Sequence, residues 1–374
     1  MQAAPLSAGQ PAAPTARRHR RGAAVYIAGA LAGLLSLLHG SLATAAGYYD
    51  EQGYFVREAK AVSSLGPQLF GEQVNHSNGG VSFVQTDISL KGNSALPMAV
   101  ARSLRSSPAL PFTVGHFGKW DLEIPRVHGF FTSKGFTNAS YGTNRCSSFS
   151  APPNVSGSKG GWFFTKEYWQ GNMLYVPGAG DQEILKRDPS VAAPADGNSY
   201  PLSTRELWMI RCIPLAAGGT GEGFLAVSPS GVQYQFDRLV QRTAGSMQND
   251  YGSSTGRVDV WILPSVIRDR FGNTVTFTYD ATTPMRLLKM TASDGRAITF
   301  TYGTGNRIAT ASDGVNTWSY GYDGTGDLSS VTLPDSSTWT FSHDPYFFYT
   351  DASTSPTRSV ATSGKCRRGS APSP

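Results

Sequence analysis

Apolar and polar residues alternate in a series of short runs between Val232 and Phe341. In the run TVTFTY from residue 274, Val275, Phe277 and Tyr279 share one face and the threonines share the other. A period of two is typical of a β-strand with one buried face, and threonine is a good strand former that tolerates water. Four further runs put large apolar residues on one face in the same way: Tyr234 with Phe236, Phe300 with Tyr302, Trp318 with Tyr320, and Trp339 with Phe341.

A turn sequence precedes each of these runs, and a shorter apolar run, such as LLKM from Leu287, precedes the turn. Aspartate followed by glycine supplies the positive φ that tight hairpin turns require, so each unit is predicted to be a β-hairpin. The units read SPSGVQYQFD from Ser228, DRFGNTVTFTYD from Asp269, SDGRAITFTYG from Ser293, SDGVNTWSYGYD from Ser312 and LPDSSTWTFSHD from Leu333. The turn residues expected to define the repeat are Asp269, Gly272, Asn273, Asp294, Gly295, Asp313, Gly314 and Asp335.

The spacing of the units indicates how they fold together. Successive turn aspartates at positions 269, 294, 313 and 335 are 25, 19 and 22 residues apart. Repeats of this size cannot bury an apolar face alone, so neighbouring units must stack into one core. We therefore predict an all-β fold, with stacked β-hairpin repeats over residues 221–350 and an irregular β-rich region over residues 47–220. An ordinary β-sandwich with many hairpins is the alternative.

Composition and charge fit this prediction and exclude a class of partner. The 374 residues include 42 glycines and 23 prolines, only 16% are charged, and we expect few helices. The net charge of +6 comes from the two ends of the chain, which leaves the body nearly neutral. Without a basic stripe, no nucleic-acid partner is expected. The terminal basic residues are Arg17, Arg18, Arg20 and Arg21 at one end, and Lys365, Arg367 and Arg368 at the other.

Residues 1–46 have the features of an export signal. The basic cluster is followed by a mostly apolar run from Ala23 to Leu38 and by small residues that end with Ala45 and Ala46. This order matches the three regions of a secretory signal peptide, so we expect a periplasmic, cell-surface or extracellular protein. An uncleaved membrane anchor and export by a twin-arginine route are the alternatives.

Two further features concern the cysteines and the C-terminal end. Cys146 and Cys212 could form a disulfide in an oxidising compartment, or remain as two buried free thiols. The absence of a C-x-x-C motif excludes the usual zinc spacing. Residues 351–374 are polar and lack strand alternation, so we expect a disordered tail.

The repeat units resemble the RHS/YD repeats of bacterial secreted and surface proteins. The resemblance extends over residues 75–350, through VSFVQTDISLKGNSALPMAV from Val81, FGKWDLEIPRV from Phe117 and GEGFLAVSPSGVQYQFD from Gly221. It implies a β shell of spiralling hairpins that encloses or carries a C-terminal toxin used in competition between bacteria. The chain departs from the family pattern because it has only four or five repeats, and Asp344-Pro345 continues into Tyr346-Phe347 rather than the glycine-rich closing motif.

The sequence offers little that indicates catalysis. It contains no G-x-S-x-G, H-E-x-x-H or P-loop motif. We expect a glycine linker at 219–223 and a half-exposed strand around Asp121 and Glu123. The histidines at positions 116, 128 and 343 have no fixed spacing to acidic partners, and His343 occupies the tyrosine position of its repeat, which favours a packing role. The aromatic residues Trp162, Tyr168 and Trp169 could stack on sugars, although a core position is the favoured interpretation.

These observations predict a secreted or surface RHS/YD-repeat scaffold, a truncated shell portion of a toxin-delivery type of protein, without catalytic activity, cofactor or metal. The alternative is a module that binds cell-surface carbohydrate or cell wall. The expected partners are a C-terminal toxin domain or further repeats that this chain lacks. A few hairpins leave a strand edge open, so self-association through that edge is also expected.

Overall fold

The computed structural model describes residues 62–63, 72–75, 80–94, 96–106, 115–136, 142–249, 252–348 and 359–368. The chain divides into the units Met1–Tyr54 and Phe55–Pro374, and all described residues belong to the second. The expected export signal, residues 1–46, lies outside the described residues. Helices in the described part are the four-residue α3 (Ser133–Phe136) and α5 (Thr165–Tyr168), with a 3-10 turn at Thr304–Asn306. None of these helices is long and apolar enough to cross a lipid bilayer.

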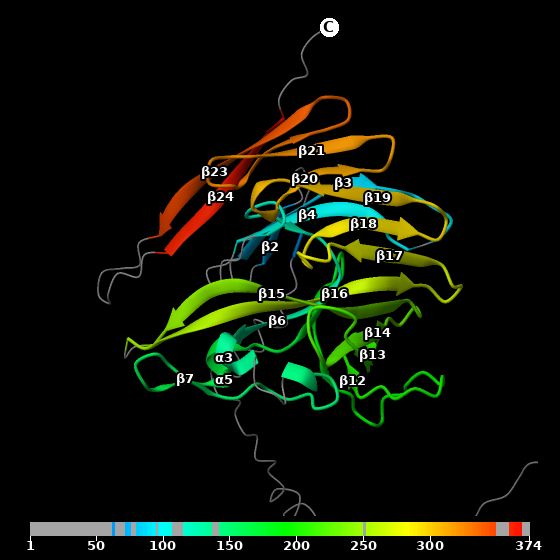
Figure 1. Ribbon diagram of the computed structural model, residues 1–374, viewed down its shortest axis with the longest axis vertical. Coiled ribbons are helices and arrows are strands. Elements are labelled where there is room, and N and C mark those ends of the chain that lie inside the picture. Colours follow the sequence, from blue (N-terminus) through cyan, green and yellow to red (C-terminus); the bar gives the residue numbers. More distant parts are fainter. Residues whose placement is uncertain are drawn as a thin grey trace, which may run out of the picture. The chain divides into compact units, whose positions relative to one another are not determined.

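The described chain is nearly all β, as the alternating runs predict. Most strands belong to one large antiparallel sheet, called here the repeat sheet, in which each strand from β11 to β24 pairs with the next (Figure 1). Its strands are β11 (Leu185–Lys186), β12 (Leu202–Ser203), β13 (Met209–Pro214), β14 (Glu222–Val227), β15 (Gln233–Gln248), β16 (Ser254–Arg268), β17 (Thr274–Tyr279), β18 (Leu287–Ala292), β19 (Ala297–Tyr302), β20 (Ile308–Ser312), β21 (Thr317–Tyr322), β22 (Leu328–Thr332), β23 (Thr338–Phe348) and β24 (Ser359–Arg368).

The repeat sheet branches at β16. The end of β16 pairs with β17 at Val266–Arg268, whereas its earlier part, Arg257–Ile262, pairs with β6 (Arg126–Thr132). The branch continues through β9 (Met173–Val176) to β10 (Gly180–Glu183). The long β15–β16 ribbon therefore joins the repeat strands to the region that precedes them.

Two smaller sheets come from the region that the sequence predicts to be irregular and β-rich. One is a five-stranded antiparallel sheet, called here the N-terminal sheet, in the order β1 to β5. Its strands are β1 (Val62–Ser63), β2 (Glu72–Asn75), β3 (Gly80–Ser89), β4 (Ala99–Ser106) and β5 (Asp121–Leu122). The other is a two-stranded ribbon of β7 (Val155–Ser156) and β8 (Trp162–Phe163).

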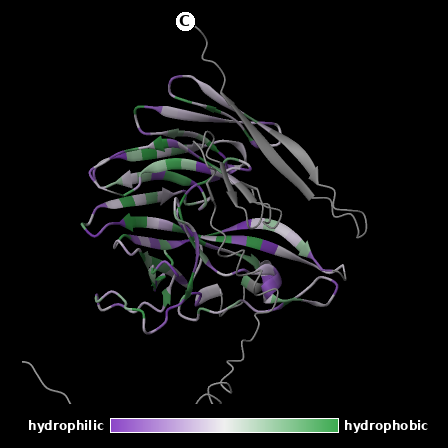
Figure 2. Cartoon of the chain, turned by 180° about the vertical axis from the view of Figure 1, so that it is seen from behind, coloured by the Kyte–Doolittle hydropathy of each residue, from purple (hydrophilic) through white to green (hydrophobic). Residues whose placement is uncertain are grey.

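The facing of the repeat strands follows the alternation of the sequence. On β17, Val275, Phe277 and Tyr279 are buried, while Thr276 and Thr278 are exposed. Green apolar and paler or purple polar positions alternate along these strands in Figure 2. The other apolar repeat residues lie in the same core or pack against it: Tyr234, Phe236, Phe300 and Tyr320 are buried, and Tyr302, Trp318, Trp339 and Phe341 are partly buried.

Aspartate side chains close the hairpin turns. Asp269 Oδ1 accepts the backbone N–H groups of Phe271 and Asn273, each at 2.9 Å, and Asp269 Oδ2 accepts the side-chain amide of Asn273. Asp294, Asp313 and Asp335 accept the backbone N–H two residues later in the same way, which is an Asx turn. Positive φ angles occur at all three predicted turn glycines: Gly272, Gly295 and Gly314.

In the β16–β17 and β18–β19 hairpins, a tyrosine at the end of the second strand bonds to the first strand of the same hairpin. The hydroxyl of Tyr279 donates to the carbonyl of Pro264 at 2.9 Å, and that of Tyr302 donates to Leu287 at 3.0 Å. Burial raises the pKa of both hydroxyls, so they remain donors. Each ring also faces a guanidinium: Arg238 lies over Tyr279, Arg286 over Tyr302 and Arg307 over Tyr322, at 5.3, 5.2 and 5.8 Å.

We expect Tyr279→Phe to lower the free energy of unfolding by about 1–2 kcal/mol, because the Pro264 carbonyl loses its partner inside the core. Tyr234→Phe is the matched control: Tyr234 is 7% exposed, close to the 6% of Tyr279, and its hydroxyl bonds to none of the described residues. A urea titration of both variants measures the difference. Equal losses would contradict a role for the hydroxyl bond.

We expect the turn aspartates to make the stability of the protein depend on pH in the acidic range. The hydrogen bond from Arg296 lowers the pKa of Asp294 to about 2. An unfolded aspartate titrates near about 4, so this contribution is fully present above about pH 4 and is lost as the pH falls toward about 2. We expect Asp294→Asn to flatten the decline of melting temperature with pH in that window. Identical pH profiles of the two proteins in thermal melts would contradict this expectation.

The C-terminal end differs from the expected disordered tail. Residues Ser359–Arg368 form β24, which pairs with β23 over ten residues. Trp339 is opposite Arg368 and Phe341 is opposite Cys366, so β24 covers the edge of β23 that was expected to be open. This strand could not be predicted, because a neighbouring edge can impose strand pairing on a segment without alternation.

Candidate functional site: a strap across the repeat sheet

The segment Gly115–Ile124, called here the strap, lies against successive repeat units. It begins beside β20, where the Ile308 N–H donates to the carbonyl of His116 at 2.9 Å. The later contacts pass to β21, to the loop before β22, and to β23. They are Phe117 against Tyr320, with ring centroids 4.7 Å apart, the Lys119–Asp327 ion pair at 2.6 Å, and Trp120 against Phe341 at 5.6 Å.

Two glycines permit the tight course of the strap. Gly118 has a φ of +76°, and a Cβ there would come within 2.5 Å of the Gly326 carbonyl oxygen. A Cβ on Gly115 would come within 2.3 Å of the Trp120 carbonyl oxygen. The backbone approaches the carbonyl of Trp120 at Gly115 and the loop before β22 at Gly118. Both approaches are so close that a side chain would not fit at either position.

A buried ion pair lies where the N-terminal sheet meets the repeat sheet. Arg102 of β4 donates to both carboxylate oxygens of Asp87 on β3, at 2.8 and 3.1 Å, and the Tyr320 hydroxyl donates to the same carboxylate at 3.0 Å. The side chains of Arg102 and Asp87 are 1% and 3% exposed. Burial and the negative charge of Asp87 raise the pKa of Tyr320, which keeps its hydroxyl a donor.

Aromatic rings enclose the Arg102 guanidinium. Its central carbon is 5.2 Å from the centre of the Trp120 ring and 5.0 Å from that of Phe341. Cation–π attraction of this kind strengthens when water is excluded. Arg102 therefore contacts its own sheet, the strap and the last repeat hairpin at once.

A second charged network involves His116 and Asp121 of the strap. His116 Nδ1 is 2.7 Å from Asp121 Oδ1, and Arg242 of β15 reaches both Asp121 at 2.5 Å and Asp259 of β16 at 2.7 Å. Burial alone would raise the pKa of Asp121, but the Arg242 charge and the His116 hydrogen bond hold it well below the usual value. Arg242 also lies 3.8 Å from the centre of the Trp261 ring.

These contacts correct the half-exposed strand expected around Asp121 and Glu123. Leu122 and Glu123 are both buried, and Glu123 accepts the hydroxyl of Tyr175, so the two carboxylates bond to different partners. The wrong prediction came from reading alternation as exposure, although here both faces of the segment are covered. Sequence reasoning found the FGKWDLEIP motif as a resemblance but missed its contacts.

The histidines also have partners that their spacing does not indicate. His116 Nε2 lies 3.1 Å from the Met285 carbonyl oxygen, while Nδ1 faces Asp121. His128 Nε2 lies 2.8 Å from Asp181 Oδ1, across β6 and β10. The side chain of His343 is outside the described residues. His116 and His128 thus each connect separate elements through polar contacts, whereas the packing role expected for His343 stays a prediction.

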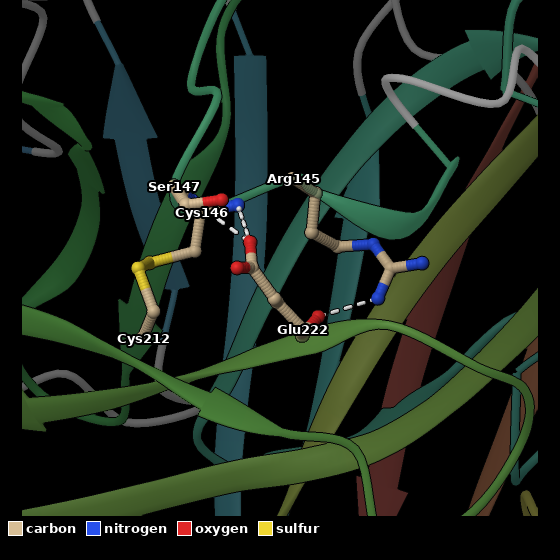
Figure 3. The surroundings of a disulfide bond; sticks show 5 residues. All are labelled: Arg145, Cys146, Ser147, Cys212 and Glu222. Atoms are coloured by element: carbon tan, nitrogen blue, oxygen red, sulfur yellow. Dashed lines mark hydrogen bonds between the residues drawn. A yellow bond between two sulfur atoms is a disulfide. The ribbon is translucent and has the colours of Figure 1, made fainter.

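Cys146 and Cys212 form a disulfide, one of the two states that the sequence left open (Figure 3). It ties the segment after α3 to β13, over a sequence separation of 66 residues. Glu222 Oε2 accepts the backbone N–H groups of Cys146 and Ser147 at 3.0 and 2.8 Å, and the Arg145 side chain donates to the Glu222 carbonyl. The cross-link therefore lies in a hydrogen-bonded junction with β14.

The remaining candidates from the sequence fall into two groups. The glycine segment at 219–223 leads into β14, a strand, as expected for a linker rather than a phosphate loop. Of the three aromatic residues, Tyr168 is buried, Trp169 packs against the core, and Trp162 is 61% exposed. No group of three or more His, Cys, Asp or Glu side chains in the described part of the chain could hold a metal ion.

Comparison with known proteins adds limited information. No protein-family model matches the sequence, and no curated protein matches it. Similar solved structures include the crystal structure of TcdB2-TccC3, with 10% identity and a TM-score of 0.37, covering 78% of this chain and 18% of that one. TcdB2-TccC3 without its hypervariable C-terminal region has 10% identity and a TM-score of 0.32, with coverage of 76% and 15%. This chain thus spans less than a fifth of the length of either structure.

Proposed function

We propose that this chain is an exported or surface scaffold of the RHS/YD-repeat type, a shell portion of a toxin-delivery protein. The observation that carries the proposal is the strap, which contacts successive repeat units from β20 to β23 through His116, Phe117, Lys119 and Trp120. A segment that contacts consecutive hairpins fixes the positions of those hairpins relative to one another. Such a device suits a wall that must keep its form while it carries another domain.

The scaffold has no catalytic role of its own in this proposal. Its most concentrated charged groups are Arg102 with Asp87, and Asp121 with Arg242 and Asp259. Each of these groups bonds to a neighbouring element of the protein, and their side chains are 20% exposed or less. Buried, mutually paired charges of this kind also occur in structural networks, where they fix one arrangement of the chain.

The partners proposed for the scaffold are further repeat strands, which would take the place of β24 beside β23, or a C-terminal toxin domain. An epitope-tagged reporter domain fused after residue 374 tests the carrier role in a bacterial host. We expect the reporter to reach the periplasm, cell surface or medium, and to remain inside the cell when residues 1–46 are deleted. A reporter that stays inside the cell with the full chain would contradict the proposal.

Carbohydrate or cell-wall binding is the second candidate, supported by the exposure of Trp162. Two of the three aromatic residues that suggested it, Tyr168 and Trp169, pack inside the protein instead. A glycan array of the chain and its Trp162→Ala variant separates the candidates. Binding to a defined sugar that the variant loses would favour a surface binding module over a scaffold.

A further inference from the structure

Two aromatic side chains project from the β7–β8 ribbon. Trp162 is 61% exposed and Phe164 is 51% exposed, whereas Phe163 between them is 1% exposed. The alternation puts Trp162 and Phe164 on one outward face, here called the aromatic tip. Phe163 packs with Val155 and Tyr168 in a small core of its own below the ribbon. Exposed aromatic pairs on a folded protein commonly mark an interaction surface.

The ribbon that bears the aromatic tip is held in place at its turn. The Ser158 hydroxyl is 3.0 Å from that of Ser254, at the start of β16, and the Lys159 N–H donates to the Ser253 hydroxyl at 3.1 Å. A Cβ on Gly157 would come within 2.0 Å of the same Ser253 hydroxyl, so the turn fits closely against β16. The backbone that carries the rings is therefore held in place before binding, which lowers the cost of ordering it on binding.

The other end of the ribbon is fixed as well. The Thr165 hydroxyl donates to the Pro152 carbonyl at 2.6 Å, and Asn154 Oδ1 accepts the Thr165 N–H at 2.9 Å. These bonds join the start of α5 to the segment before β7, which lies near α5 in Figure 1. They also engage the polar side chains of Thr165 and Asn154 in bonds within the protein.

The sequence around the aromatic tip is basic. Between residues 125 and 180 the sequence contains one acidic residue, Glu167, and its carboxylate accepts the N–H of Phe164. Lys159 lies in the ribbon turn, and Lys166 is in α5. The Lys134 ammonium donates to the Ser156 carbonyl on β7, which places a third positive charge beside the ribbon.

We propose that the aromatic tip docks the chain on an anionic lipid bilayer surface. Trp162 would enter the boundary between headgroups and acyl chains, where its amphipathic ring is favoured, and the apolar ring of Phe164 would enter beside it. The three lysines would lie at headgroup level, and each lysine near an anionic leaflet strengthens binding by about fivefold. The charge and the exposed aromatic residues together match such a surface, and this role goes beyond that of a scaffold.

Co-sedimentation with vesicles tests the proposal on the exported, full chain. The probes are vesicles of phosphatidylcholine alone and of phosphatidylcholine mixed with phosphatidylglycerol. We expect binding to the mixed vesicles that weakens as salt increases, and a loss of about tenfold or more in W162S/F164S. K159E/K166E should also lose binding to the mixed vesicles.

Two variants outside the ribbon serve as matched controls. F271S removes a phenylalanine that is 76% exposed at the β16–β17 turn, and K289E reverses an exposed lysine on β18. Both should bind the mixed vesicles as the unmodified chain does, and circular dichroism verifies folding of all variants. Full vesicle binding by W162S/F164S, or an equal loss in F271S, would overturn the proposal. A folded chain that binds neither kind of vesicle but binds a sugar through Trp162 would also overturn the proposal.

Discussion

Replacement of Arg102 by methionine is expected to lower the free energy of unfolding by about 3–5 kcal/mol, because it leaves the Asp87 carboxylate buried without its counter-ion. The methionine keeps much of the volume between Trp120 and Phe341 but removes the cation–π contacts as well as the two hydrogen bonds. A denaturant titration followed by circular dichroism measures the loss.

The double variant D87N/R102M is the control for this interpretation. An asparagine at position 87 removes the unpaired charge and can still accept the hydroxyl of Tyr320. We therefore expect the double variant to be more stable than R102M alone, which is the pattern of a coupled pair. If the two losses simply added, the ion pair would not be the reason for the effect of R102M.

Removal of the Cys146–Cys212 disulfide has the second large expected effect. For a loop of this length, the chain-entropy model gives a stabilisation of about 4 kcal/mol, which the variant C146S/C212S should lose. The third cysteine supplies the control, since C366S should leave the free energy of unfolding unchanged within about 0.5 kcal/mol. Mass spectrometry of non-reduced exported protein is the direct measurement, and free thiols at positions 146 and 212 would contradict the pairing.

The repeat strands could be predicted because their signals are local. In β17 the alternation of Val275, Phe277 and Tyr279 with threonines determines which face is buried, and Asp294-Gly295 marks its own turn. A strand period and a turn are specified within a few neighbouring residues. The facing and the hairpins therefore follow from the sequence without knowledge of their neighbours.

The contacts between the N-terminal sheet and the repeat strands could not be predicted in the same way. The Tyr320–Asp87 hydrogen bond joins residues 233 positions apart, and that between Arg296 and the Leu90 carbonyl joins residues 206 apart. Nothing near Asp87 in the sequence indicates either partner. One signal in the sequence was usable: an arginine directly before an apolar run, as in Arg286-Leu287 and Arg307-Ile308. Each of these arginines lies over a tyrosine that comes later in the sequence, Tyr302 for Arg286 and Tyr322 for Arg307.

The scaffold proposal depends on whether the edge of β23, near the end of the repeat sheet, is open or covered by another strand. Thr338–Phe341 alternates like the earlier strands, and between Val331 and Phe341 the only charged residue is Asp335. An edge of this kind pairs readily with another strand. In the structure β24, which contains Lys365, Arg367 and Arg368, occupies this position. Charged residues in an edge strand discourage further pairing.

Light scattering of two chains at micromolar concentration is the most direct test that the repeat sheet is a scaffold extended by added strands. Residues 47–350 lack β24 and should self-associate through the edge of β23, whereas residues 47–374 should associate less. Both chains should show no hydrolase activity. A monodisperse monomer for residues 47–350 would contradict the account and indicate a closed, independent binding domain.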